Sequence, residues 1–315
     1  NSLVFAYFPI KSFGFKFIIH ADFQTVTNRE DLPEDNSWNL WLIKQLQSVM
    51  IAAIEDFKND DNLKFQFYKY FPTKSEIELP FTSFIEDLYN NLRDYNCILS
   101  EDSKWEKPSK VKIINPKIRK LFPKPQDFHS IFDVDYKFVE NRIISKESKN
   151  IFEELNIQEF SFHDLCRLLE NYDWIKEQDK IWFLGLFKAF IEQYKKEIEV
   201  YDNVKLLKKL KIFKVQNGQV LSPAENKIYF KIADSNYGFE RIFNILPKEF
   251  DNKEFELFFK RLGILELSTY EINDFIRKLY QSKKWVDFNE DFLTNIIIYL
   301  KDKYLDNQGG TKCQN

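Results

Sequence analysis

Few side chains in this sequence are placed where they can do chemistry together. The chain has three histidines and three cysteines, and they lie far apart along the sequence. His20 and Asp22 are two positions apart, so on a strand they face the same side as a formal acid–base pair. No nucleophile accompanies them, and we interpret them as structural. A zinc site needs several ligands that converge, and since the sequence shows no such cluster we expect no metal site.

The strongest charge pattern is a basic run from Lys107 to Lys124. Seven Lys and Arg residues and no acidic residue occupy these 18 positions. Two interpretations stay open: the run binds a phosphate backbone or an acidic partner, or it is a solvated loop in a nearly neutral protein. The candidate residues for nucleic-acid or acidic-partner binding are Lys110, Lys112, Lys117, Arg119 and Lys120.

The composition excludes several classes of function. Only seven glycines occur, and none has the spacing of a phosphate-binding loop, so no glycine-rich nucleotide loop lies within this chain. The 46 Lys and Arg residues balance 49 Asp and Glu residues, so no global attraction to nucleic acid or anionic membranes is expected. The longest apolar runs fall far short of the roughly 20 residues that span a bilayer, so we expect no membrane partner.

The cellular setting is inferred from what the ends and the cysteines show. The N-terminus has no basic start of a secretory signal, and three scattered cysteines indicate a reducing compartment, so we expect a soluble cytoplasmic protein. The chain begins at Asn1 and its one methionine is Met50, so we expect a piece of a longer polypeptide. With 33 Phe, 15 Tyr and 6 Trp, it has ample apolar surface for a folded core.

The N-terminal residues are predicted to form a small β-structure followed by a helix. An apolar run ends at Pro9, a turn follows at 12–14, and residues 15–21 alternate as in a strand. Asn36 or Ser37 is placed to cap a helix. That helix continues to residue 57, and we expect it to pack on something large through an apolar stripe at three-to-four spacing, formed by Trp38, Leu42, Leu46, Val49, Ala53 and Phe57.

The rest of the chain contains an internal repeat. Residues 155–161 match residues 262–268, with Ser161 and Ser268 each placed as a helix N-cap. Upstream, residues 97–108 match residues 212–223, and both segments predict a β-hairpin followed by proline. Asn217 and Gly218 are a strong hairpin turn, since we expect both to have positive φ, and Asp102 and Ser103 take the same place in the first copy.

These elements predict a helix-rich α+β protein. It has a small N-terminal β-sheet with a helix, followed by two repeated modules of helix, β-hairpin and helix. The expected domains are 1–60, 61–200 and 201–315, of which the last two are the α+β modules.

The first 57 residues carry a series of spaced motifs. These are Phe8-Pro9 at the end of an apolar strand, then G-x-x-F-x-I-x-x-D-F from Gly14 to Phe23, the Asn28-Arg29-Glu30 element, and W-N-x-W-L from Trp38 to Leu42. The run resembles the segment that follows the ATP-binding domain in the sacsin and NO VEIN group of very large proteins. Those proteins carry a GHKL-type domain, the ATP-binding fold shared with gyrase, histidine kinases and the ninety-kilodalton heat-shock chaperone.

The resemblance implies that Arg29 touches the γ-phosphate of ATP bound upstream, because a similar element brings an arginine there in the heat-shock chaperone. ATP and Mg²⁺ are then expected on the upstream domain and not on this chain, which lacks the GHKL motifs that hold them. A second interpretation is a surface arginine paired with Glu30 or Asp31. The resemblance implies that this chain alone is no enzyme and that the full-length protein is an ATPase.

The resemblance also implies partners. The first 60 residues transmit the nucleotide state of the upstream GHKL domain, and the two modules hold a protein client, as in a chaperone. The alternative is a nucleic-acid-handling accessory region of a bacterial defence or restriction-type ATPase, since proteins resembling this family also occur there. A self-contained hydrolase is disfavoured because no nucleophile, base and orienting group lie together.

Overall fold

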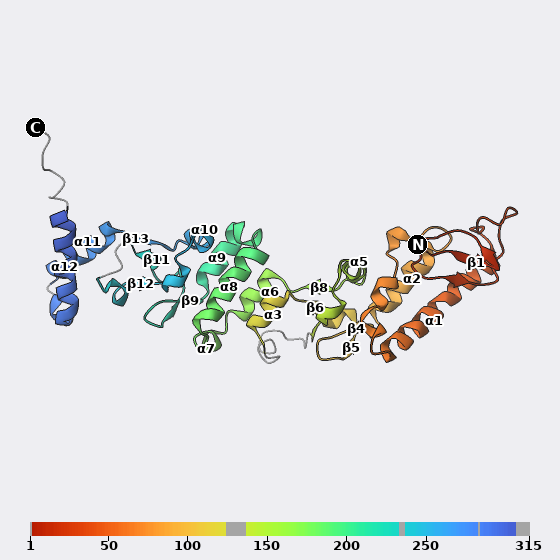
Figure 1. The fold of residues 1–315 in the computed structure, drawn as a ribbon, viewed down its shortest axis with the longest axis horizontal. Coiled ribbons are helices and arrows are strands. Elements are labelled where there is room, and N and C mark those ends of the chain that lie inside the picture. The colour runs from red at the N-terminus through yellow and green to blue at the C-terminus, as the bar shows by residue number, and fades with distance from the viewer. Residues whose placement is uncertain (1, 124–136, 233–236, 283, 307–315) are drawn as a thin grey trace, which may run out of the picture. The chain divides into compact units, whose positions relative to one another are not determined.

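The computed structural model describes residues 2–123, 137–232, 237–282 and 284–306, which fall into two compact units (Figure 1). Unit 1 contains the described residues within 1–119 and 124–160, and unit 2 contains those within 120–123 and 161–315. Helices dominate and the sheets are small, so the predicted α+β class is confirmed. The three predicted domains, 1–60, 61–200 and 201–315, stay a prediction.

Unit 1 begins with a sheet of three short strands. Its central strand β1 (Val4–Ala6) is antiparallel to β2 (Phe8–Pro9) and parallel to β3 (Ile19–His20). A small sheet is therefore present as predicted, but the segments on the two sides of the predicted turn at 12–14 pair in parallel and do not form a hairpin. The predicted alternating strand over 15–21 is wrong for most of its length, because residues 13–15 turn inward and bury their side chains instead of pairing.

The inward turn requires a glycine. Phe13 and Phe15 are fully buried, and their rings lie 5.1 and 5.0 Å from the ring of Phe81. Gly14 between them has φ +94°, and a Cβ there would lie 1.7 Å from the backbone carbonyl oxygen of Glu76. Only a residue without a side chain fits so close to the neighbouring backbone.

Helix α1 (Ser37–Asn59) begins where the sequence predicts, and the side chain of Asn36 accepts a hydrogen bond from the backbone N–H of Asn39. The predicted apolar stripe is the core face only in part, since Trp38 and Val49 are 44% and 58% exposed, whereas Leu42, Leu46 and Phe57 pack partly buried against the core. Helix α1 contacts α2 (Thr82–Arg93), and its fully buried face is a row beside the stripe. The buried residues of α1 are Asn39, Ile43, Met50 and Ile54.

The remainder of unit 1 is built from short elements. Three 3₁₀ turns, Leu63–Phe65, Phe67–Tyr70 and Lys74–Glu76, lie between α1 and α2. Strands β4 (Ile98–Leu99) and β5 (Trp105–Glu106) form a hairpin. A parallel sheet has β6 (Val111–Ile113) between β7 (Lys137–Phe138) and β8 (Gln158–Glu159), with α5 (Lys146–Glu154) before β8. Helix α3 (Pro116–Leu121) follows β6 and crosses into unit 2.

Unit 2 opens with helices. These are α6 (Phe162–Leu168), α7 (Tyr172–Ile175), α8 (Lys180–Gln193) and α9 (Tyr201–Lys209). A hairpin of β9 (Phe213–Lys214) and β10 (Val220–Leu221) follows. A parallel sheet has β11 (Ile228–Ile232) between β12 (Asn244–Ile245) and β13 (Leu265–Leu267). Helices α10 (Lys253–Arg261), α11 (Thr269–Gln281) and α12 (Glu290–Asp306) complete the unit.

The two parallel sheets have the same strand order, and each follows a hairpin along the chain. Ser161 and Ser268 both form the N-terminal caps that the sequence predicts. Asn156 and Gly263, which follow the matched helices α5 and α10, both have positive φ, so the match of asparagine to glycine preserves one backbone conformation. In the hairpin turns, Ser103 and Gly218 have positive φ but Asn217 does not, so our expectation for Asn217 is wrong.

Candidate functional site

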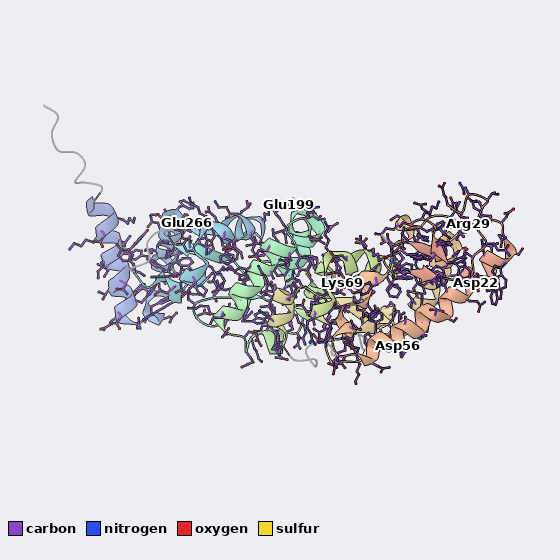
Figure 2. All side chains as sticks on the ribbon, turned by 45° about the vertical axis from the view of Figure 1, so that its right-hand side comes forward. Asp22, Arg29, Asp56, Lys69, Glu199 and Glu266 are labelled. Atoms are coloured by element: carbon purple, nitrogen blue, oxygen red, sulfur yellow. The ribbon has the colours of Figure 1, made fainter. Side chains whose placement is uncertain are left out.

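The candidate site is the loop of residues 22–36 between β3 and α1, which we call the Arg29 loop. Arg29 lies at its tip with φ +61°, a conformation that few residues other than glycine adopt. Its backbone N–H donates to the carbonyl oxygen of Val26, and the N–H of Val26 donates to the carbonyl oxygen of Asp31. These bonds close a tight turn that leaves the side chain of Arg29 exposed (Figure 2).

The base of the loop is held by the first turn of α1. Asn39 is fully buried, its Oδ1 accepts from the N–H of Gln24 at 2.8 Å, and its Nδ2 donates to the carbonyl oxygen of Gln24 at 2.8 Å. The indole Nε1 of Trp38 donates to the carbonyl oxygen of Asp22 at 2.8 Å. The Trp-Asn pair of the W-N-x-W-L motif therefore fixes the start of the Arg29 loop on α1.

The carboxylates beside Arg29 have other partners. The Nζ of Lys11 donates to Asp31 at 2.8 Å, and the side-chain amide of Asn28 donates to Glu30 at 3.0 Å. Partial burial acts to raise the pKa of Asp31, but hydrogen bonds from Lys11 and from the N–H of Leu32 outweigh it and lower that pKa. Neither Glu30 nor Asp31 accepts from Arg29.

The guanidinium of Arg29 has no hydrogen-bond, ion-pair or ring partner in the part of the chain that the structure describes. Its planar fork of N–H donors is permanently charged and matches carboxylate and phosphate oxygens. An unpartnered guanidinium on a loop with a fixed base is suited to contact an anion outside the described residues.

The candidate basic residues are placed in different environments. Arg119 donates from Nε and Nη2 to the carboxylate of Glu101 at 2.9 and 2.8 Å, and Lys112 is buried in β6. Lys110 ends a 3₁₀ turn, and Lys117 and Lys120 lie on α3, all three exposed. Lys124 lies outside the described residues. Three of the five candidates therefore lie on the surface, Lys112 is buried, and Arg119 is paired with Glu101.

The described cysteines and histidines make no nucleophilic site. Burial raises the pKa of Cys97 and of Cys166 to about 12, so both thiols stay protonated near neutral pH. The ring of His20 packs edge-on against Phe5 and Tyr7, and the two centroid distances are both 6.4 Å. No group of His, Cys, Asp and Glu in the described residues is arranged to hold a metal ion.

Asn39 is the residue that our interpretation of the sequence missed as part of the site. A polar side chain on a buried helix face adds nothing to an apolar periodicity, so the periodicity of α1 does not reveal it. The signal that was available is its place inside the W-N-x-W-L motif, three residues after the N-cap Asn36.

The sequence is similar to one curated protein, the Arabidopsis thaliana protein NO VEIN. The two are 33% identical over 128 residues, which cover 38% of this chain and 5% of the length of NO VEIN. The chain thus matches a small part of that relative. No protein family matches the sequence, and no solved structure is significantly similar to it. Among the described residues, none of the helices is long and apolar enough to cross a membrane.

Proposed function

We propose that this chain is part of a larger NO VEIN-like protein and couples the nucleotide state of an upstream GHKL-type ATP-binding domain to the binding of a partner protein. The observation that carries the proposal is the unpartnered guanidinium of Arg29 on the Arg29 loop. The similarity to NO VEIN and the spaced motifs of the first 57 residues support it.

In this proposal, ATP and Mg²⁺ belong to the upstream domain. The support for that division is the exposed guanidinium fork of Arg29, which matches a terminal phosphate. Arg29 would donate hydrogen bonds to the γ-phosphate and stabilise its charge. The chain itself then contributes one charged contact, and it is no enzyme without the upstream domain.

The connection from the Arg29 loop to the rest of unit 1 runs through hydrogen bonds between the side chain of Asn39 and the loop backbone. The loop is bonded to Asn39 at residue 24, and Asn39 lies in the first turn of α1, a helix of 23 residues. A displacement of the loop tip is therefore passed to a long, stiff element. This supports a coupling role, since a rigid helix carries a local change over about 35 Å.

The test is ATP turnover by the full-length protein that contains the upstream domain. We expect Arg29→Ala to lower kcat by about 10²- to 10³-fold, the usual loss for one donor to developing charge. Arg29→Lys keeps the positive charge but lacks the planar fork, so its kcat is expected to lie between those of Arg29→Ala and the unmodified protein. Arg277→Ala, at an exposed arginine of α11 in unit 2, is the matched control. Unchanged turnover and nucleotide affinity in Arg29→Ala would remove the proposal.

A further inference from the structure

Helix α12 is the counterpart of helix α8 in the internal repeat. Residues 180–194 match residues 290–304, so the first copy of the repeat ends with α8 and the second copy ends with α12. The match aligns apolar positions along one face of the two helices. On α8 these positions are Phe183, Phe187 and Phe190, and on α12 they are Leu293, Ile297 and Leu300.

The N-terminal caps of the two helices support this match. The side chain of Asp179 accepts from the N–H of Trp182 at 2.8 Å, and that of Asn289 accepts from the N–H of Phe292 at 3.0 Å. The two capping residues occupy matched positions, and Trp182 and Phe292 are matched and buried. The helices therefore begin at equivalent positions, and their faces can be compared residue by residue.

The second copy covers one face of α8. Phe183, Phe187 and Phe190 are fully buried. The ring of Phe187 lies 5.2 Å from the ring of Phe213 in β9 and 5.5 Å from the ring of Phe259 in α10. We call the hairpin β9–β10 together with α10 the receiving surface, because it receives the last helix of the preceding copy.

The matched face of α12 is uncovered. Ile297, the counterpart of Phe187, is 66% exposed, and Ile298 beside it is 43% exposed. In the described part of the chain, no hairpin or helix covers Ile297 as β9 and α10 cover Phe187. Single exposed isoleucines are common on proteins, but the last copy in a repeat protein has a polar outer face when nothing follows it. An apolar outer face is typical of a copy that packs on another.

A second molecule of this chain has no free receiving surface to offer. In the second copy that surface already holds α8. In the first copy the counterpart of α10 is α5, and its Phe152, which matches Phe259, is 1% exposed. The ring of Phe152 lies 5.6 Å from the ring of Tyr68, which precedes the repeat, so the chain covers this surface itself. This disfavours a dimer through α12.

We propose that α12 is covered by a further copy of the repeat, located downstream in the same polypeptide. That copy supplies a hairpin with an apolar residue in the place of Phe213. Its next helix supplies apolar side chains at the spacing of Phe255, Phe258 and Phe259, the buried residues of α10. The inference goes beyond the proposed function, since it requires neither ATP nor Arg29.

The experiment compares Ile297→Cys in the 315-residue chain and in the full-length protein. Alkylation at residue 297 is followed by peptide mass spectrometry, which separates this thiol from the native cysteines. We expect alkylation to be at least about tenfold slower in the full-length protein, because a covered thiol reacts only when the contact opens. Circular dichroism checks that the variant keeps the fold.

Tyr270→Cys is the matched control. Tyr270 is 73% exposed on α11, and its counterpart His163 on α6 is exposed although the second copy covers α8. A further copy that packs in the same way leaves residue 270 exposed. We therefore expect equal alkylation rates at residue 270 in the two proteins.

A photo-crosslinker attached to the thiol at residue 297 identifies what covers it. We expect a crosslink to a hairpin or helix downstream of residue 306 in the same polypeptide. Equal alkylation of residue 297 in the two proteins, equal slowing at residues 270 and 297, or a crosslink to another protein would overturn the inference. Sedimentation of the 315-residue chain adds a further test, because a dimer that Ile297→Glu converts to a monomer would assign this face to a second molecule.

Discussion

Replacement of Asn39 by alanine removes both hydrogen bonds that hold the Arg29 loop on α1. Each of these bonds is 2.8 Å long and joins a fully buried side chain to the backbone of Gln24. A bond of this kind contributes about 1 kcal/mol, and an unsatisfied partner group adds to the loss. We therefore expect the free energy of unfolding of unit 1 to fall by about 2–3 kcal/mol.

The assay is amide hydrogen exchange, followed at the N–H of Gln24, together with urea unfolding. Because the Oδ1 of Asn39 accepts directly from this N–H, its exchange in Asn39→Ala is expected to rise by up to about 10²-fold. Asn39→Asp keeps an acceptor for the N–H but loses the donor to the carbonyl oxygen, so its effect is expected to be smaller.

The control is Asn91→Ala, which removes an exposed hydrogen bond to Gln47 on the surface of unit 1. It is expected to change stability by less than about 0.5 kcal/mol. If Gln24 exchanges at the same rate in Asn39→Ala and in the unmodified chain, the reasoning about the anchored loop is refuted.

Three further predictions concern the rest of unit 1 and the basic run. Gly14→Ala is expected to lower the free energy of unfolding by about 3 kcal/mol or more, because its Cβ would overlap a backbone carbonyl oxygen; a urea midpoint equal to that of the unmodified chain would contradict it. The pKa of Asp31 is lowered in the folded state, so the ion pair with Lys11 stabilises unit 1 above about pH 4, the unfolded value, and this stabilisation is lost as the pH falls through the folded pKa. The difference in unfolding midpoint between the unmodified chain and Asp31→Asn is thus expected at pH 7 and absent well below pH 4; a difference independent of pH would refute the assignment. In filter binding at two salt concentrations we expect no retention of nucleic acid, because Arg119 is paired and Lys112 is buried; salt-sensitive retention would restore the nucleic-acid alternative.

Local signals in the sequence predict the ends of the main elements well. A side-chain cap acts within one helical turn, so the caps at Asn36 and Ser161 follow from residue type and position. Likewise, the left-handed residue after a helix is an asparagine at 156 and a glycine at 263, two residue types that tolerate this conformation. The fold class could be inferred because it depends mostly on such local signals, which fix where helices and strands begin and end.

The orientation of α1 could not be inferred, because it depends on which side chains other segments supply. An apolar stripe predicts that one face of a helix is covered, but it does not say by what. In unit 1 Ile43 and Met50 are buried, whereas Val49 of the stripe is 58% exposed. The pairing of Asp31 was equally hidden, since its partner Lys11 lies 20 positions away in the sequence.

The most direct test of the coupling role is hydrogen exchange in the full-length protein with and without a non-hydrolysable ATP analogue. If Arg29 contacts the γ-phosphate, the analogue is expected to slow exchange in residues 22–36 and in the first turns of α1. The same experiment on Arg29→Ala is expected to show no slowing, while Arg277→Ala keeps it. Equal slowing in the unmodified protein and in Arg29→Ala, or none in either, would contradict the account.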